Sequence, residues 1–267
     1  QRTVTVKSAR SQDDQQALRL EAWITGFLDH PHIVTIHDAG DDFLVLQQLS
    51  GHSLLDLIGS TDPVGQIRIL LAVIDALLFA HEHGILHRDL KPANILIGDL
   101  GEVVVTNWGL ACTWDGAPAT PAWVPRLSDD LVCAGTPAYC PPEVAAGQGD
   151  AVSPAADIFA LGACLYTCLN GHPPFIAADT HGSLALAVIN QAAPIDPRQP
   201  GRLRRLVEDC MATDVAARPP LATIQTELRQ WLAQRNAAEE AGTIAALAAE
   251  DPPDRHASYD RLRRQAA

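Results

Sequence analysis

One run of charged and polar side chains, HRDLKPAN at residues 87–94, limits the possible folds of this chain more than any other segment. A predicted helix precedes the run, because Asp62 before a proline is a helix-start signal and Gly84 is a helix-end signal. Two short apolar segments follow at residues 95–97 and 103–106, and both are typical of strands. The run is therefore predicted to be a loop that joins a long helix to a pair of short strands.

Hydrophobic periodicity divides the rest of the chain into a small β-rich segment and a mainly helical one. Apolar residues recur near one face of residues 13–28, which predicts a helix. The runs on either side of it predict strands at residues 4–7, 33–37 and 43–47. Further helices are predicted at residues 157–169, 183–189, 202–211 and 221–234. The Ala-rich segment 236–267 is predicted to form one or two helices, broken at Pro252 and Pro253.

The HRDLKPAN run closely resembles the catalytic loop of protein kinases. Phosphoryl transfer needs a carboxylate that orients the attacking hydroxyl, cations near the phosphates and ligands for Mg²⁺. The resemblance implies that Asp89 is the catalytic base, that Lys91 steadies the γ-phosphate and that Asn94 binds Mg²⁺. It also implies structural roles for His87 and Arg88. Lysine at position 91 is typical of serine/threonine kinases, as opposed to tyrosine kinases.

The resemblance continues upstream of the loop. The strand at residues 4–7 matches the family strand that ends in the ATP-positioning lysine, and Glu21 matches the glutamate that pairs with this lysine. The run at residues 46–49 matches the hinge, whose backbone groups bind adenine. The nucleotide-binding residues implied by these matches are Lys7, Glu21, Leu46, Gln47 and Leu49.

Downstream, GTPAY at residues 135–139 and the Pro-Pro-Glu that follows resemble the end of an activation segment. By this resemblance Glu143 forms a buried ion pair with Arg218, and Asp157 holds the backbone of the catalytic loop. Thr136, within the GTPAY run, is expected to form a hydrogen bond with the catalytic loop. Ser128, in the proline-rich loop before it, is a candidate phosphorylation site.

One motif departs from the family pattern. The metal-binding triplet Asp-Phe-Gly is replaced by Asn107-Trp108-Gly109, at the distance from Asp89 that the family requires. Trp108 is expected to keep the contact with His87. An asparagine oxygen can coordinate Mg²⁺ but brings no charge, and a unit-charge pair at 4 Å is worth about 4 kcal/mol at an effective dielectric constant near 20. Asn107 is therefore predicted to be a metal ligand with impaired binding, which lowers the rate of transfer by about 10²–10³.

By this resemblance the chain is identified as a member of the protein kinase superfamily, of the bacterial (eukaryotic-like) serine/threonine type. The implied fold is α+β and two-lobed, with a small partial β-sheet lobe containing one helix and a mainly helical large lobe. The expected parts are residues 1–48 for the partial small lobe, 49–235 for the large lobe and 236–267 for a helical tail. Only six residues precede Lys7, so they do not include the glycine-rich loop that covers ATP. An N-terminal truncation is the simplest expectation, and a true loss of this loop is the alternative.

Composition limits the partners. The formal net charge of −13 argues against nucleic acid, which requires clustered Lys and Arg. The apolar stretch at residues 67–80 is interrupted by Arg68 and Asp75, so an amphipathic helix is expected and no membrane segment. The six cysteines include no C-x-x-C pair, and a reducing, cytoplasmic compartment is expected. The three histidines within residues 81–87 are interpreted as the ordinary approach to the catalytic loop, not as a metal cluster.

Two functions fit the sequence. The first is phosphoryl transfer to protein Ser/Thr that depends on ATP and Mg²⁺ and is weakened by Asn107. The second is that of a pseudokinase, which binds nucleotide or serves as a scaffold for a signalling partner without catalysis. A small-molecule kinase shares the fold, but Lys91 and the segment at residues 135–143 argue against it.

Overall fold

The computed structural model describes residues 3–126, 135–148, 152–175 and 200–249, with side chains described as far as residue 238. Its internal contacts divide the chain into two units, Gln1–Thr226 and Glu227–Ala267. Three predicted features lie outside the described residues, namely Ser128, the helix at 183–189 and the break at Pro252 and Pro253.

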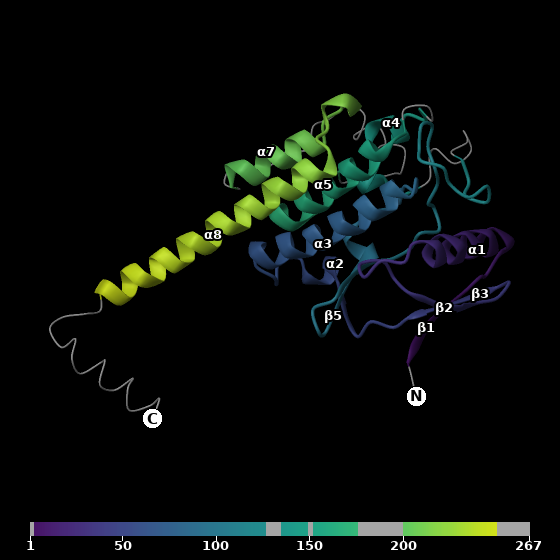
Figure 1. Cartoon of the computed structure of the whole chain (residues 1–267), viewed down its shortest axis with the longest axis horizontal. Helices are drawn as coiled ribbons and strands as arrows, with labels where there is room; N and C mark the ends of the chain where they lie inside the picture. The colour runs from purple at the N-terminus through teal and green to yellow at the C-terminus, as the bar shows by residue number, and fades with distance from the viewer. Residues whose placement is uncertain (1–2, 127–134, 149–151, 176–199, 250–267) are drawn as a thin grey trace. The chain divides into compact units, whose positions relative to one another are not determined.

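The small lobe is an antiparallel sheet covered by one helix (Figure 1). Its elements are β1 (Val4–Ser8), α1 (Gln12–Phe27), β2 (Ile36–Ala39) and β3 (Phe43–Gln47). The strand order is β1-β3-β2, so the central strand is the one that leads into the large lobe. Ala22 of α1 packs with Val34, Leu44 and Leu46 to form the core of this lobe. The predicted β-α-β-β order is confirmed.

The large lobe is mainly helical, and α5 lies at its centre. Its elements include α2 (Leu54–Leu57), α3 (Pro63–Glu82), α4 (Pro142–Ala145), α5 (Pro154–Asn170) and α7 (Gly201–Cys210). All residues of α5 from Ala156 to Cys168 are buried, and the helix packs against α3 and α7. A second antiparallel sheet has the order β4-β5-β6, with strands Gly51–Ser53, Ile95–Gly98 and Val103–Val105. The catalytic-loop residues 87–94 lie between α3 and β5, as predicted.

β2 begins three residues later than the pattern of apolar residues predicts, at Ile36 in place of Ile33. Ile33 forms an isolated parallel bridge with Val105 of β6. The N–H of Val34 donates a hydrogen bond to the carbonyl of Val105 at 3.1 Å. These two residues therefore link the small lobe to the large lobe instead of extending the small sheet.

α3 begins and ends where the sequence predicts. The carboxylate of Asp62 accepts a hydrogen bond from the N–H of Gly65 at 2.6 Å, and Gly84 follows the helix with a φ of 72°, which glycine adopts at little cost. Among the described helices, α3 alone is long and apolar enough to cross a membrane, but more than half of its most apolar window is buried within the protein. In this structure α3 is a core helix of the large lobe.

α8 (Leu221–Ala249) is longer than predicted. The sequence pattern places a helix end at residue 234 and a new segment from residue 236, whereas one helix continues through both positions. Residues 236–249 are rich in alanine, which has the highest intrinsic helix propensity, so no local signal ends the helix there. The expected start of a tail at residue 236 therefore falls inside a helix.

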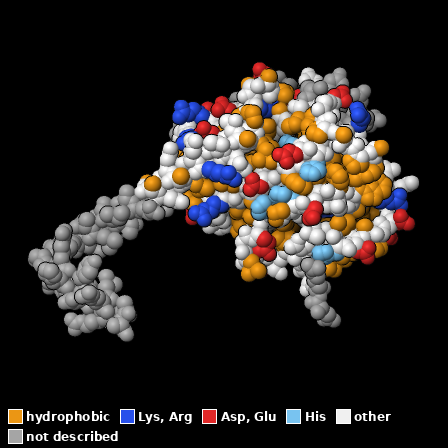
Figure 2. All heavy atoms as spheres, viewed as in Figure 1, with side chains coloured by type: hydrophobic (Ala, Val, Ile, Leu, Met, Phe, Trp, Pro, Cys, Tyr) orange, Lys and Arg blue, Asp and Glu red, His pale blue; other side chains and the backbone are white. Residues whose placement is uncertain are grey.

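The surface of the chain is mixed in character. On the face shown in Figure 2, hydrophobic and acidic side chains alternate with small, separate groups of Lys and Arg. This arrangement agrees with the formal net charge of −13.

Candidate active site

Asp157 on α5 holds the backbone of the catalytic loop. Its carboxylate accepts hydrogen bonds from the N–H groups of His87 at 2.9 Å and Arg88 at 3.0 Å. His81 Nε2 lies 2.8 Å from the same carboxylate. Burial alone would raise the pKa of Asp157, but the hydrogen bond from His81 and the backbone donors outweigh burial and lower this pKa. An ionised, buried carboxylate therefore fixes the loop, as predicted, and Arg88 takes a left-handed φ of 67°.

The three histidines before and within the loop have separate partners. His87 is buried, its Nε2 lies 3.0 Å from the carbonyl of Thr106, and its ring meets the ring of Trp108 edge-on at 4.5 Å. Burial lowers the pKa of His87, so the ring is neutral at pH 7. His81 contacts Asp157, and His83 Nδ1 lies 2.8 Å from the carbonyl of Phe79. Within the described residues, His, Cys, Asp and Glu side chains form no cluster that could hold a metal ion.

Four side chains donate hydrogen bonds to the predicted catalytic base, Asp89. Thr136 contacts Oδ1 at 2.6 Å, and Lys91, Asn94 and Asn107 contact Oδ2 at 2.9, 3.1 and 3.3 Å. Burial alone would raise the pKa of Asp89, but the hydrogen bonds from Lys91 and Thr136 outweigh burial, so the pKa lies below its ordinary value. The structure thus brings the predicted residues of the loop together around one ionised carboxylate.

The predicted nucleotide-binding pair is formed in the small lobe. Lys7 Nζ lies 2.7 Å from Glu21 Oε1, which joins β1 to α1. The Glu21 side chain is only 4% exposed, whereas that of Lys7 is 34% exposed. Lys7 also donates a longer hydrogen bond, 3.4 Å, to Oδ1 of Asn107. The ammonium group is therefore held in place from one side and open to solvent on another.

The predicted hinge residues lie where β3 leaves the small lobe. Leu46 is buried and is paired with Thr5 of β1. The N–H of Gln47 donates to the carbonyl of Thr35 at 2.8 Å, so this N–H already has a partner within the protein. Leu49 is half-buried in the segment between β3 and β4. The structure places all three at the connection between the lobes.

Glu143 and Arg218 form the buried ion pair that the sequence predicts. The two carboxylate oxygens accept hydrogen bonds from the guanidinium at 2.6 and 2.7 Å. Neither side chain is more than 3% exposed. The guanidinium also lies 5.0 Å from the ring centre of Phe159 and donates to the carbonyls of Ala155 and Ala212. This pair ties α4, which follows the activation segment, to the loop before α8.

The oxygen donors near Asp89 do not fit a tightly held divalent cation. Asn94 donates its amide group to the carbonyl and carboxylate of Asp89, and the amide oxygen of Asn107 faces the ammonium of Lys7. Asn94 and Asn107 bring no charge, whereas protein sites for Mg²⁺ normally include one or two carboxylates. Asp89, the remaining oxygen donor, already accepts four hydrogen bonds. The chemistry considered below is therefore that of the chain's own side chains.

The two-lobed α+β fold and the polar cluster between its lobes define a protein kinase domain. The protein kinase domain model matches residues 2–231, and the chain belongs to this family, in its bacterial serine/threonine branch. It is 33% identical over 229 residues to serine/threonine-protein kinase PknA of Mycobacterium tuberculosis, which covers 80% of this chain and 50% of that protein.

Two further relatives are PknB kinases. The chain is 34% identical over 199 residues to PknB of Mycolicibacterium smegmatis, covering 69% of this chain and 29% of that protein. It is 33% identical over 192 residues to PknB of Mycobacterium leprae, covering 68% of this chain and 29% of that protein. The chain thus spans about half the length of PknA and less than a third of PknB.

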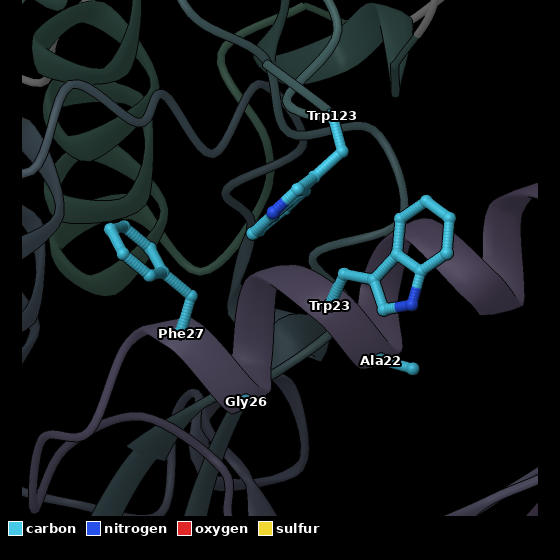
Figure 3. A pocket seen from close by; sticks show the side chains of 5 residues that line it. All are labelled: Ala22, Trp23, Gly26, Phe27 and Trp123. Carbon is cyan, nitrogen blue, oxygen red and sulfur yellow. The ribbon is translucent and has the colours of Figure 1, made fainter. Parts of the chain in front are cut away.

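A groove of about 470 Å³, which the sequence did not predict, lies between α1 and Trp123. Trp123 reaches down from the segment after Trp108 and lies between two aromatic side chains of the helix, Trp23 and Phe27 (Figure 3). Its ring centre is 5.8 Å from that of Trp23 and 5.9 Å from that of Phe27. Trp23 stands two positions after Glu21 and is 54% exposed. The signal available in the sequence was a tryptophan two positions after Glu21, the predicted partner of Lys7.

Proposed function

We propose that this chain binds ATP and transfers its γ-phosphoryl group to a serine or threonine hydroxyl of a protein substrate. The observation that carries the proposal is the ionised Asp89, positioned by Thr136 at 2.6 Å and by Lys91 at 2.9 Å. In the proposed step the hydroxyl oxygen bonds to the γ-phosphorus and its proton passes to Asp89. The bond between the γ-phosphorus and the bridging oxygen breaks, and ADP leaves with that electron pair.

Lys7 and Lys91 each have a role in the proposed transfer. Lys7, held by Glu21 at 2.7 Å, is directed at the α- and β-phosphates. Lys91 lies between Asp89 and Thr136 and contacts both, so its ammonium can stabilise the transferred group while Asp89 receives the proton. Leu46, Gln47 and Leu49 are proposed to border the adenine.

The rate of transfer is proposed to be low, because Asn107 supplies no charge to a bound cation. The affinity for Mg²⁺ is accordingly proposed to be impaired. Asn107 also favours a second candidate function, that of a pseudokinase that binds nucleotide and serves as a signalling module without transfer. The reducing cytoplasm remains the proposed location.

The two candidates are separated by an assay of transfer from radiolabelled ATP to a generic Ser/Thr protein substrate. The full-length protein, Asp89→Ala and Asn107→Asp are compared, with Gln148→Glu as a control that adds the same charge at an exposed position. Wild-type transfer that is lost in Asp89→Ala supports the kinase. Silence of the wild type together with transfer by Asn107→Asp assigns the defect to the missing charge. Silence of both the wild type and Asn107→Asp overturns the proposed transfer and favours the pseudokinase.

A further inference from the structure

The side chain of Asn107 bridges the two lobes of the site. Its Oδ1 accepts a hydrogen bond from Lys7 Nζ at 3.4 Å, and its Nδ2 donates one to Asp89 Oδ2 at 3.3 Å. Lys7 belongs to β1 of the small lobe and Asp89 to the catalytic loop of the large lobe. One neutral amide therefore connects the ammonium that is proposed to bind phosphate with the proposed catalytic base.

The two partners determine which way the amide points. The Lys7 ammonium can only donate, and the ionised Asp89 carboxylate can only accept. An amide satisfies both partners only with its oxygen toward Lys7 and its nitrogen toward Asp89. A carboxylate at position 107 would still attract Lys7, but it would place a second negative charge 3.3 Å from Asp89.

The charges around this bridge cancel. Lys7 is paired with Glu21 at 2.7 Å, and Lys91 with Asp89 at 2.9 Å. A nucleotide phosphate thus approaches two ammonium groups in a cluster of zero net charge. An aspartate at position 107 would give the same cluster a net charge of −1, which repels phosphate unless a cation enters with it.

We propose that Asn107 is a positioning residue that joins Lys7 to Asp89, where a kinase of the usual sequence relies on a metal ion, so that nucleotide binds here without a divalent cation. The inference rests on the proposed function, since it concerns the same nucleotide. It adds that the phosphates are held by Lys7 and Lys91, and that Asn107→Asp creates a cation requirement that the wild type lacks.

The first test measures the Kd of a non-hydrolysable ATP analogue by calorimetry, in 10 mM Mg²⁺ and in EDTA. For the wild type we expect the two Kd values to agree within about threefold. For Asn107→Asp we expect binding in EDTA to be about tenfold weaker than in Mg²⁺, which corresponds to about 1.4 kcal/mol. Gln148→Glu, with the same added charge at an exposed site, is expected to behave as the wild type. A wild-type Kd that improves tenfold or more with Mg²⁺ overturns the inference.

The second test needs no nucleotide and therefore separates this inference from the proposed function. The melting temperature of each protein is measured in EDTA and in 10 mM Mg²⁺. Asn107→Asp is expected to melt about 2–4 °C lower than the wild type in EDTA and to recover in Mg²⁺, while the wild type does not respond to the cation. A purely structural role would lower the melting temperature equally in both buffers and overturns the inference. If no protein binds nucleotide but the cation response appears, the proposed function and cation-free nucleotide binding both fail, and only the role of Asn107 in joining Lys7 to Asp89 stands.

Discussion

Two of the carboxylate–cation pairs among the described residues, Glu143–Arg218 and Lys7–Glu21, differ in how far they are enclosed. Glu143 and Arg218 make two short contacts in the large lobe, and neither side chain is more than 3% exposed. Lys7 and Glu21 make one contact in the small lobe, and 34% of the lysine side chain is exposed. An ion pair that is closed on all sides can only hold the fold together, whereas one with an open cation can also bind an anion. We therefore expect the closed pair, Glu143–Arg218, to contribute mainly to stability and the open pair, Lys7–Glu21, to serve the proposed binding of phosphate.

Glu143→Ala tests the closed pair, Glu143–Arg218, and should have the largest effect on stability. The substitution leaves the Arg218 guanidinium buried without its carboxylate, which is expected to lower the free energy of unfolding by about 3–5 kcal/mol. Urea unfolding followed by circular dichroism measures the loss. Asp115→Ala is the matched control, because it breaks the exposed pair with Arg126 and should leave stability unchanged. A loss below about 1 kcal/mol for Glu143→Ala would contradict the assignment.

Asp157→Asn extends the comparison to the buried carboxylate that holds the catalytic loop. The amide is neutral and has a single accepting oxygen, whereas the N–H groups of His87 and Arg88 donate to different oxygens of the carboxylate, so we expect a loss of about 1.5–3 kcal/mol at pH 7. Because the folded-state pKa of Asp157 is lowered, its contribution is present above the unfolded value of 3.8 and is lost as pH falls through the folded value. The difference between wild type and variant should therefore shrink below pH 3.8. Unfolding is measured for both proteins at several pH values. A difference in the free energy of unfolding between wild type and Asp157→Asn that is the same at every pH would argue against this role.

Lys7→Met tests the open pair, Lys7–Glu21. We expect a smaller loss of stability than for Glu143→Ala but a large loss of transfer. Solvent screens the lysine, which is 34% exposed, but the buried Glu21 loses its partner, so the free energy of unfolding should fall by about 1–3 kcal/mol, less than for Glu143→Ala. Transfer should fall by about 10²–10³, because a positioned cation is lost from the phosphates. Arg19→Met, which removes an exposed cation on α1 of the same lobe, is the control. A stability loss as large as that of Glu143→Ala, with transfer retained, would reverse the roles of the two pairs.

Trp123→Ala is expected to have the smallest effect. It removes the ring contacts with Trp23 and Phe27 of α1, at a cost of about 0.5–1.5 kcal/mol. Because α1 carries Glu21, the open pair should loosen slightly and transfer should fall by less than about tenfold. Thermal unfolding and the transfer assay measure the two effects. Equal effects from the neighbouring Val124→Ala, which removes a buried side chain outside the groove, would show that the aromatic contact is not the cause.

Sequence reasoning located the parts of the site whose chemistry depends on residue type and spacing. The partners of Asp157, the Glu143–Arg218 pair and the Lys7–Glu21 pair all lie within contact distance, because motif spacing in this fold determines which side chains meet. The order of the longer strands and helices was predictable for the same reason, whereas the short elements β4 and α4 were not predicted. Hydrophobic periodicity added the helix that carries Glu21.

Features that depend on tertiary contacts were not predictable. The residues at 33 and 34 have a strand-like pattern but pair with Val105 of the other lobe, which delays β2. The aromatic groove joins Trp123 to two residues about one hundred positions earlier, and no motif connects them. The bridge made by Asn107 was likewise hidden, since its residue type indicates a lost charge but not the direction in which the amide points.

The backbone at position 107 has a consequence for how this site can evolve. Its φ of 68° lies in the left-handed region that asparagine and aspartate tolerate better than most side chains. The two amino acids have codons that differ only in the first base. The exchange therefore needs a single nucleotide substitution and leaves the local conformation intact, so that a lineage could gain or lose dependence on a metal ion without rebuilding the domain.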